Sequence, residues 1–121
     1  MKQKVHSVSY LAKAEFKLKN GVYDLVAIPS GAEVVKVSLE VVGNYTVGTV
    51  SVGFKDESTK NYFLTLEKNT NQSNNATSSK DYAATSDKVI VAEVKATASE
   101  SDAKGVLRVL YFLPSVIEVE Y

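Results

Sequence analysis

Apolar side chains alternate with polar ones along most of this sequence, and that alternation limits what the chain can fold into. The clearest case is Glu33 to Val42, where one apolar set takes every second position: Val35, Val37, Leu39 and Val41. Successive side chains of a strand point to opposite faces of a sheet, so this pattern predicts a half-buried strand. No segment shows the 3.6-residue period that is typical of an amphipathic helix.

The same alternation predicts further strands along the chain, at residues 5–11, 15–19, 22–28, 49–54, 62–66, 88–96, 106–113 and 115–121. Turn residues separate them: Asn20-Gly21 is typical of a two-residue hairpin, and Pro29-Ser30-Gly31 predicts a turn between strands. About eight short strands indicate an all-β fold, a single-domain antiparallel β-sandwich with jelly-roll character. A barrel is the close alternative. The 121 residues fit one domain, without internal repeats.

Two segments depart from simple alternation. Residues 67–88 are crowded with Asn, Ser, Thr, Asp and Lys and predict a long polar loop, either solvated or an arm that orders against a partner. The strand at 106–113 is apolar on both faces except at Arg108, so it is central in a sheet or covered on its outer face by a partner.

The last segment, 115–121, alternates Ile117, Val119 and Tyr121 with Glu118 and Glu120. Such an ending predicts a docked C-terminal strand or arm, because chain ends fray unless something holds them. It docks either on its own sheet or on a neighbouring subunit.

Charge and composition exclude several classes of function. The 14 basic residues balance the 14 acidic ones, which argues against a nucleic-acid partner. Cysteine is absent, so disulfides and thiol chemistry are excluded. We find no signal peptide and no apolar run long enough for a membrane span, and expect synthesis in the cytoplasm and no membrane partner.

A reaction centre is not evident. His6 is the single histidine, and we expect it on the surface or at a sheet edge. A small hydrolase would need His6 or a carboxylate pair to converge on a pocket, but Glu118 and Glu120 share one face of one strand, as solvated residues do. We therefore predict no enzyme, no catalytic residue, no metal and no cofactor.

The residue order resembles small head proteins of tailed bacteriophages. Ile28-Pro29-Ser30-Gly31-Ala32, followed by the long strand to Val41, matches a strand, turn and strand pattern of that family. Similar stretches follow at 48–53, 61–64 and 105–111. The resemblance spans roughly residues 22 to 113, and the Asn-rich stretch 69–75 departs from the pattern.

The resemblance implies a β-sandwich or jelly-roll decoration (cement) protein of the virion. Such proteins sit on the outer capsid surface and bridge major capsid protein subunits, often as trimers. We accordingly expect the major capsid protein and further copies of this chain as partners. The predicted contact residues are Asn71, Asn74, Asn75, Val116, Ile117, Val119 and Tyr121. The alternative is a phage tail or fibre module that binds a receptor or glycan.

Overall fold

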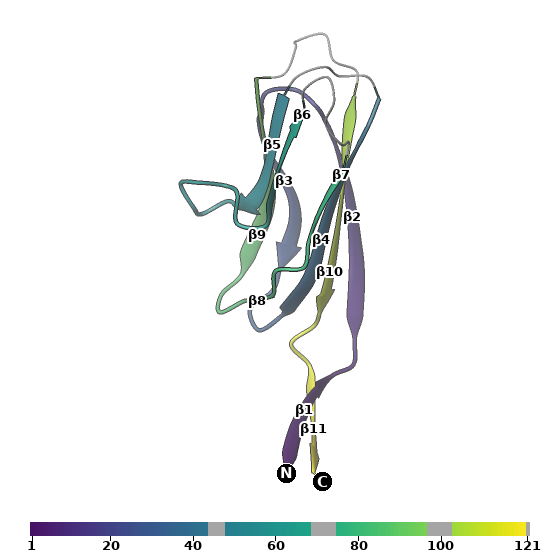
Figure 1. Cartoon of the computed structure of the whole chain (residues 1–121). Coiled ribbons are helices and arrows are strands. Elements are labelled where there is room, and N and C mark those ends of the chain that lie inside the picture. Colours follow the sequence, from purple (N-terminus) through teal and green to yellow (C-terminus); the bar gives the residue numbers. More distant parts are fainter. Residues whose placement is uncertain (44–47, 69–74, 97–102, 121) are drawn as a thin grey trace.

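Two β-sheets pack face to face, and a narrow two-stranded ribbon that carries both termini projects from one end of them (Figure 1). The structure is a computed structural model that describes residues 1–43, 48–68, 75–96 and 103–120. These residues contain no helix long and apolar enough to cross a membrane.

The two sheets have the strand order of a jelly roll. The first sheet runs in the order β2 (Ser9–Lys17), β10 (Lys104–Phe112), β4 (Glu33–Val42) and β7 (Asn75–Ser78), and β8 (Tyr82–Ala83) also pairs with β4. The second sheet runs in the order β3 (Gly21–Ile28), β9 (Lys88–Lys95), β5 (Gly48–Phe54) and β6 (Leu64–Lys68). Every pairing is antiparallel, and the chain passes repeatedly from one sheet to the other. The predicted all-β, jelly-roll-like sandwich is confirmed.

The described residues form eleven strands rather than about eight. β7 and β8 were not predicted, whereas β11 (Val116–Glu120) is the strand predicted at 115–121. β11 pairs with β1 (Lys2–His6), and the two together make the ribbon. The strand predicted at 5–11 is divided between β1 and β2, because β1 pairs with β11 whereas β2 pairs with β10. The Val8 carbonyl at this division accepts a hydrogen bond of 2.8 Å from the Leu113 amide.

One apolar core lies between the two sheets. Its largest fully buried side chains come from both layers and include Phe54, Leu39, Leu107 and Ile90. In β4 the buried side chains are Val34, Val37, Leu39 and Val41, whereas Val35 was predicted inside and is only half-buried. A bulge opposite Leu110 and Tyr111 in β10 shifts the register here, which turns Val34 inward and Val35 outward.

The Asn20-Gly21 turn does not close a hairpin. It carries the chain from β2 in the first sheet to β3 in the second. Leu18, fully buried, sits at this corner and its amide donates a hydrogen bond to the Ala103 carbonyl, 2.9 Å away. The turn therefore spans the two layers, because the buried Leu18 anchors the chain between them.

The polar segment 67–88 was predicted as a loop, but its described part contains two short strands. β7 pairs with β4 from Glu40↔Asn75 to Val37↔Ser78, and Tyr82 in β8 packs on Phe54 with ring centroids 4.5 Å apart. Backbone groups make these pairings, and few side chains of β7 and β8 are buried. The polar composition of the segment therefore did not indicate strands.

Candidate interaction surface

The β1–β11 ribbon has a fixed register and a fixed root. Its opposed pairs run from Lys2↔Glu120 to His6↔Val116. At the root, His6 Nδ1 lies 2.9 Å from the Leu113 carbonyl oxygen and is placed to donate a hydrogen bond to it. Pro114 packs on the turn before β4: a Cβ added to Gly31, whose φ is +88°, would lie 2.8 Å from Pro114 Cβ. The ribbon is therefore held at its base against the sandwich.

The two faces of the ribbon differ in chemistry, because directly opposed residues of an antiparallel pair lie on the same side. The pairs Val5↔Ile117 and Gln3↔Val119 lie on one side. We call Val5, Ile117 and Val119 the apolar ribbon face. The opposite side, the charged ribbon face, carries Lys2, Lys4, Glu118 and Glu120, with His6 and Val116 at its root.

The charged ribbon face carries an ion pair. Lys2 Nζ lies 3.5 Å from Glu118 Oε1, and both side chains are more than half exposed. An exposed ion pair of this kind adds little stability. On the apolar ribbon face Ile117 is 57% exposed, and Val5 and Val119 beside it are half-buried.

The outer face of the first sheet is a second apolar surface. Leu11 is 63% exposed and, with Leu110, lies in a shallow hollow rimmed by Lys36, Ser38 and Arg108. Tyr10 is also exposed, but it lies on the other side of β2, opposite the buried Tyr111. Leu11 was not named from the sequence, although the strand at 106–113 was noted to be apolar on both faces. This strand is β10, which lies between β2 and β4 in the first sheet.

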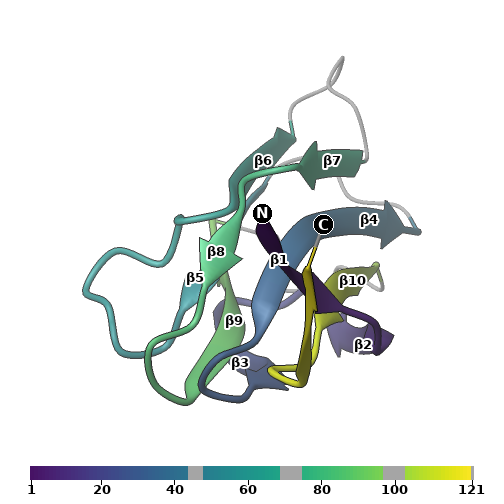
Figure 2. The same ribbon diagram turned by 90° about the horizontal axis from the view of Figure 1, so that it is seen from below.

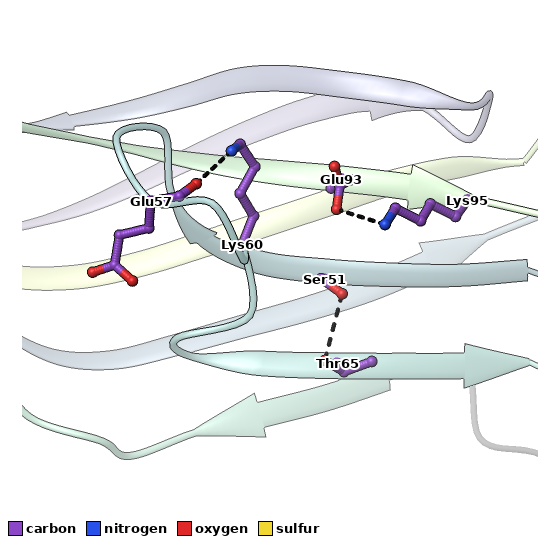
Figure 3. Close-up of polar contacts among 6 residues, drawn as sticks. All are labelled: Ser51, Glu57, Lys60, Thr65, Glu93 and Lys95. Atoms are coloured by element: carbon purple, nitrogen blue, oxygen red, sulfur yellow. Dashed lines mark hydrogen bonds and ion pairs between the residues drawn. The ribbon is translucent and has the colours of Figure 1, made fainter.

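The outer face of the second sheet is polar by comparison (Figure 3). Lys95 Nζ pairs with Glu93 Oε1 at 3.4 Å, and the hydroxyls of Ser51 and Thr65 lie 3.5 Å apart. In the connection that follows β5, Lys60 Nζ donates to the Glu57 carbonyl at 2.6 Å. The outer face of the second sheet exposes an apolar side chain too, since Val22 is 47% exposed opposite Glu93, so the two sheet surfaces differ in degree.

A further hollow lies beside the ribbon root, lined by His6, Glu33, Val35, Asp81 and Phe112. It brings the histidine near two carboxylates, but its lining holds no hydroxyl nucleophile and His6 Nδ1 is engaged by a backbone carbonyl. The described residues contain no group of three or more potential metal ligands.

Within the ranges that the structure describes, the tyrosines do not gather into one open platform. Tyr62 and Tyr82 pack with Phe54 and Phe63, with ring centroids 4.5–5.5 Å apart, and Lys80 Nζ lies 3.9 Å above the Tyr62 ring. Tyr111 is buried and contacts the edge of Tyr10. These rings serve mainly as core, so no specific observation favours a glycan-binding module.

One ion pair outside the ribbon shifts the pKa of both partners. Lys88 Nζ donates to Asp56 Oδ2 at 2.6 Å and fastens the connection after β5 to the start of β9. This hydrogen bond and the attraction of the ammonium hold the pKa of Asp56 below its ordinary value. The Asp56 carboxylate in turn raises the pKa of Lys88.

Comparison with known proteins finds no matching family model and no matching curated protein. Among solved structures, the chain is similar to one in the acidic stable capsid structure of Helicobacter pylori bacteriophage KHP30. The two are 69% identical, each is covered over 100% of its length, and the TM-score is 0.92. This chain belongs to that family of bacteriophage capsid proteins.

Two more distant phage structures share the fold of this capsid protein. A chain of the Cyanophage Pam1 capsid asymmetric unit is 19% identical, with 88% of this chain and 85% of that chain covered and a TM-score of 0.66. A chain of the capsid of Ralstonia phage GP4 is 14% identical, with 92% and 88% covered and a TM-score of 0.61. The family confirms the predicted phage virion protein with a structural, capsid-associated role.

The predicted contact residues of the capsid protein lie at opposite ends of the sandwich. Val116, Ile117 and Val119 lie on the ribbon, where Ile117 and Val119 share the apolar ribbon face and Val116 faces the other way. Asn75 opens β7 opposite Glu40, toward the end of β4 that is remote from the ribbon. Asn71, Asn74 and Tyr121 lie outside the described residues.

The C-terminal strand docks in a way that was not foreseen. It lies on neither sheet of the sandwich but pairs with β1. Figure 2, which looks at the sandwich from the ribbon end, shows the two ribbon strands in front of it with the termini close together. Pairing between the first and last strands joins residues more than 100 positions apart, which local alternation does not reveal.

Proposed function

We propose that this capsid protein decorates the outer surface of a phage capsid and stabilises it by bridging subunits of the major capsid protein. The similarity over the full length to a chain of an assembled capsid carries this proposal. A decoration protein of this kind binds the assembled shell and not its separate subunits, so it stabilises the shell by mass action. Several weak contacts per molecule then combine through multivalency.

The distribution of apolar surface supports such a role. The exposed Leu11 hollow covers part of one sheet face, and the ribbon extends from the end of the sandwich (Figure 1). A molecule with separate contact surfaces can touch more than one neighbour, which bridging requires. We propose that the outer face of the first sheet contacts the major capsid protein and that the chain acts as a homo-oligomer, with a trimer expected.

Co-sedimentation tests this function. The purified protein should pellet with particles stripped of it, in a saturable manner, and should not bind unassembled capsid protein. Leu11→Glu places a charge in the exposed apolar hollow and should weaken particle binding about tenfold, equivalent to about 1.4 kcal/mol. The matched control, Thr65→Glu on the polar face of the second sheet, should bind as the wild type does. Failure to bind at saturating protein would contradict the proposal.

A further inference from the structure

The apolar ribbon face is only partly covered within the described chain: Ile117 is 57% exposed, whereas Val5 and Val119 are half-buried. β1 and β11 pair with each other and with no other described strand, and the ribbon stands clear of both sheets (Figures 1 and 2). A lone two-stranded ribbon is marginally stable in water. The side chains of Ile117, Val119 and Val5 therefore indicate a surface that is completed by another molecule.

The two long edges of the ribbon carry opposite charge. The β1 edge holds Lys2 and Lys4 and no acidic residue, whereas the β11 edge holds Glu118 and Glu120 and no basic residue. A second ribbon in the same orientation would bring its acidic edge beside the basic edge of the first. This complementarity is between copies of this chain and needs no other partner chemistry.

We propose that the ribbon is an assembly element that joins copies of this chain. The ribbons surround a rotation axis with their apolar ribbon faces toward it, and the β1 edge of each copy lies beside the β11 edge of the next. A head-to-tail contact of this kind closes into a ring when the rotation closes. This inference rests on the homo-oligomer of the proposed function and names the surface that forms it.

Strand direction is compatible with this arrangement. β1 and β11 are antiparallel within a ribbon, and rotation about an axis along the ribbon keeps β11 of one copy antiparallel to β1 of the next. The outward backbone groups of both edges can then pair across copies, as in strand addition. Burial of the apolar face drives assembly, and the charged edges fix its orientation.

Sedimentation velocity of the full chain, without capsids, tests the proposal. The wild type should sediment as an oligomer, and Ile117→Lys should shift it to monomer. Val116→Lys is the matched control, because Val116 is a neighbouring, 43% exposed aliphatic residue on the opposite face of the ribbon. It should leave the oligomer and its thermal melt unchanged. The circular dichroism spectrum of Ile117→Lys at 25 °C should match that of the wild type, which shows that the sandwich is folded even where loss of assembly lowers its melting temperature.

Exchanging the charges of the two ribbon edges tests whether these charges orient the ribbons in the oligomer, and it leaves the apolar ribbon face unchanged. Lys2→Glu with Lys4→Glu makes both edges acidic and should reduce assembly, and adding Glu118→Lys with Glu120→Lys should restore it. A wild type that stays monomeric at all concentrations, or an Ile117→Lys variant that assembles normally, would overturn the proposal.

Particle binding distinguishes failure of this inference from failure of the proposed function. A monomer that binds stripped particles through Ile117 would identify the capsid protein as the occupant of the ribbon, and only the inference would fall. An oligomer that depends on Ile117 but does not bind particles would leave the inference standing and remove the decoration role.

Discussion

Individual side chains determine how closely neighbouring strands and connections pack. Phe16 in β2 lies over Gly105 in β10, and a Cβ added at Gly105 would lie 2.2 Å from the ring. Phe16 also stacks on Tyr23 of the second sheet, with centroids 5.5 Å apart. Gly53 permits a similar approach, because an added Cβ would lie 2.8 Å from the backbone at residues 60–62. This close approach accounts for a glycine inside β5, where a side chain would meet the backbone of the following connection.

Gly105→Ala should destabilise the protein by about 1–3 kcal/mol, because the new methyl group overpacks against the Phe16 ring. Urea denaturation measures the change. In a Phe16→Leu background the same substitution should cost clearly less, since the aromatic ring is gone. Additive costs in this double-mutant cycle would contradict the proposed clash.

The Lys88–Asp56 pair predicts a pH dependence at both extremes. The folded-state pKa of Asp56 is lowered, so its contribution to stability is present above its ordinary pKa of about 4 and is lost as the pH falls through the folded-state value. The pKa of Lys88 is raised, so its contribution is present below about pH 10.4 and is lost as the pH rises through the folded-state value.

Asp56→Asn removes this pair with little change of shape. The urea midpoint of the variant should lie below that of the wild type near pH 7, and the difference should shrink as the pH falls below 4. An unchanged difference at pH 2.5 would show that the ion pair does not cause it.

At the scale of elements, period-two alternation located strands but not their partners. The bounds predicted for β4 agree with the structure because one face of that strand is buried along its length. The inward residue at its start was predicted wrongly, since the bulge opposite Leu110 and Tyr111 arises from pairing with a strand some 75 positions away. The corner at Asn20-Gly21 and the ribbon were missed for the same reason: both depend on long-range contacts.

Because of the bulge, we expect the same substitution to lower the free energy of unfolding by different amounts at two adjacent positions. Val34→Ala should destabilise the protein by about 1–3 kcal/mol, because Val34 is fully buried and its loss leaves a cavity. Val35→Ala, on the half-buried outer side, should cost less than about 1 kcal/mol. Equal costs at the two positions, measured by thermal or urea unfolding, would argue for regular alternation instead of the bulge.

For the molecule as a whole, the jelly roll could be predicted because several segments of the right length alternate in hydropathy and turn residues separate them. The interaction surface could be predicted in part: Ile117 and Val119 were named, but their partner Val5 and the exposed Leu11 were not, because each belongs to a face formed by strands distant in sequence. Both faces expose apolar area that the isolated chain leaves in water, and we expect assembly to bury it.

An electron-microscopy map of the virion that contains this protein tests the account most directly. We expect the jelly roll on the outside of the shell, with the Leu11 face of its first sheet against at least two major capsid protein subunits and its ribbon joined to the ribbons of neighbouring copies. Density for the jelly roll inside the shell, or in the tail, would contradict the account.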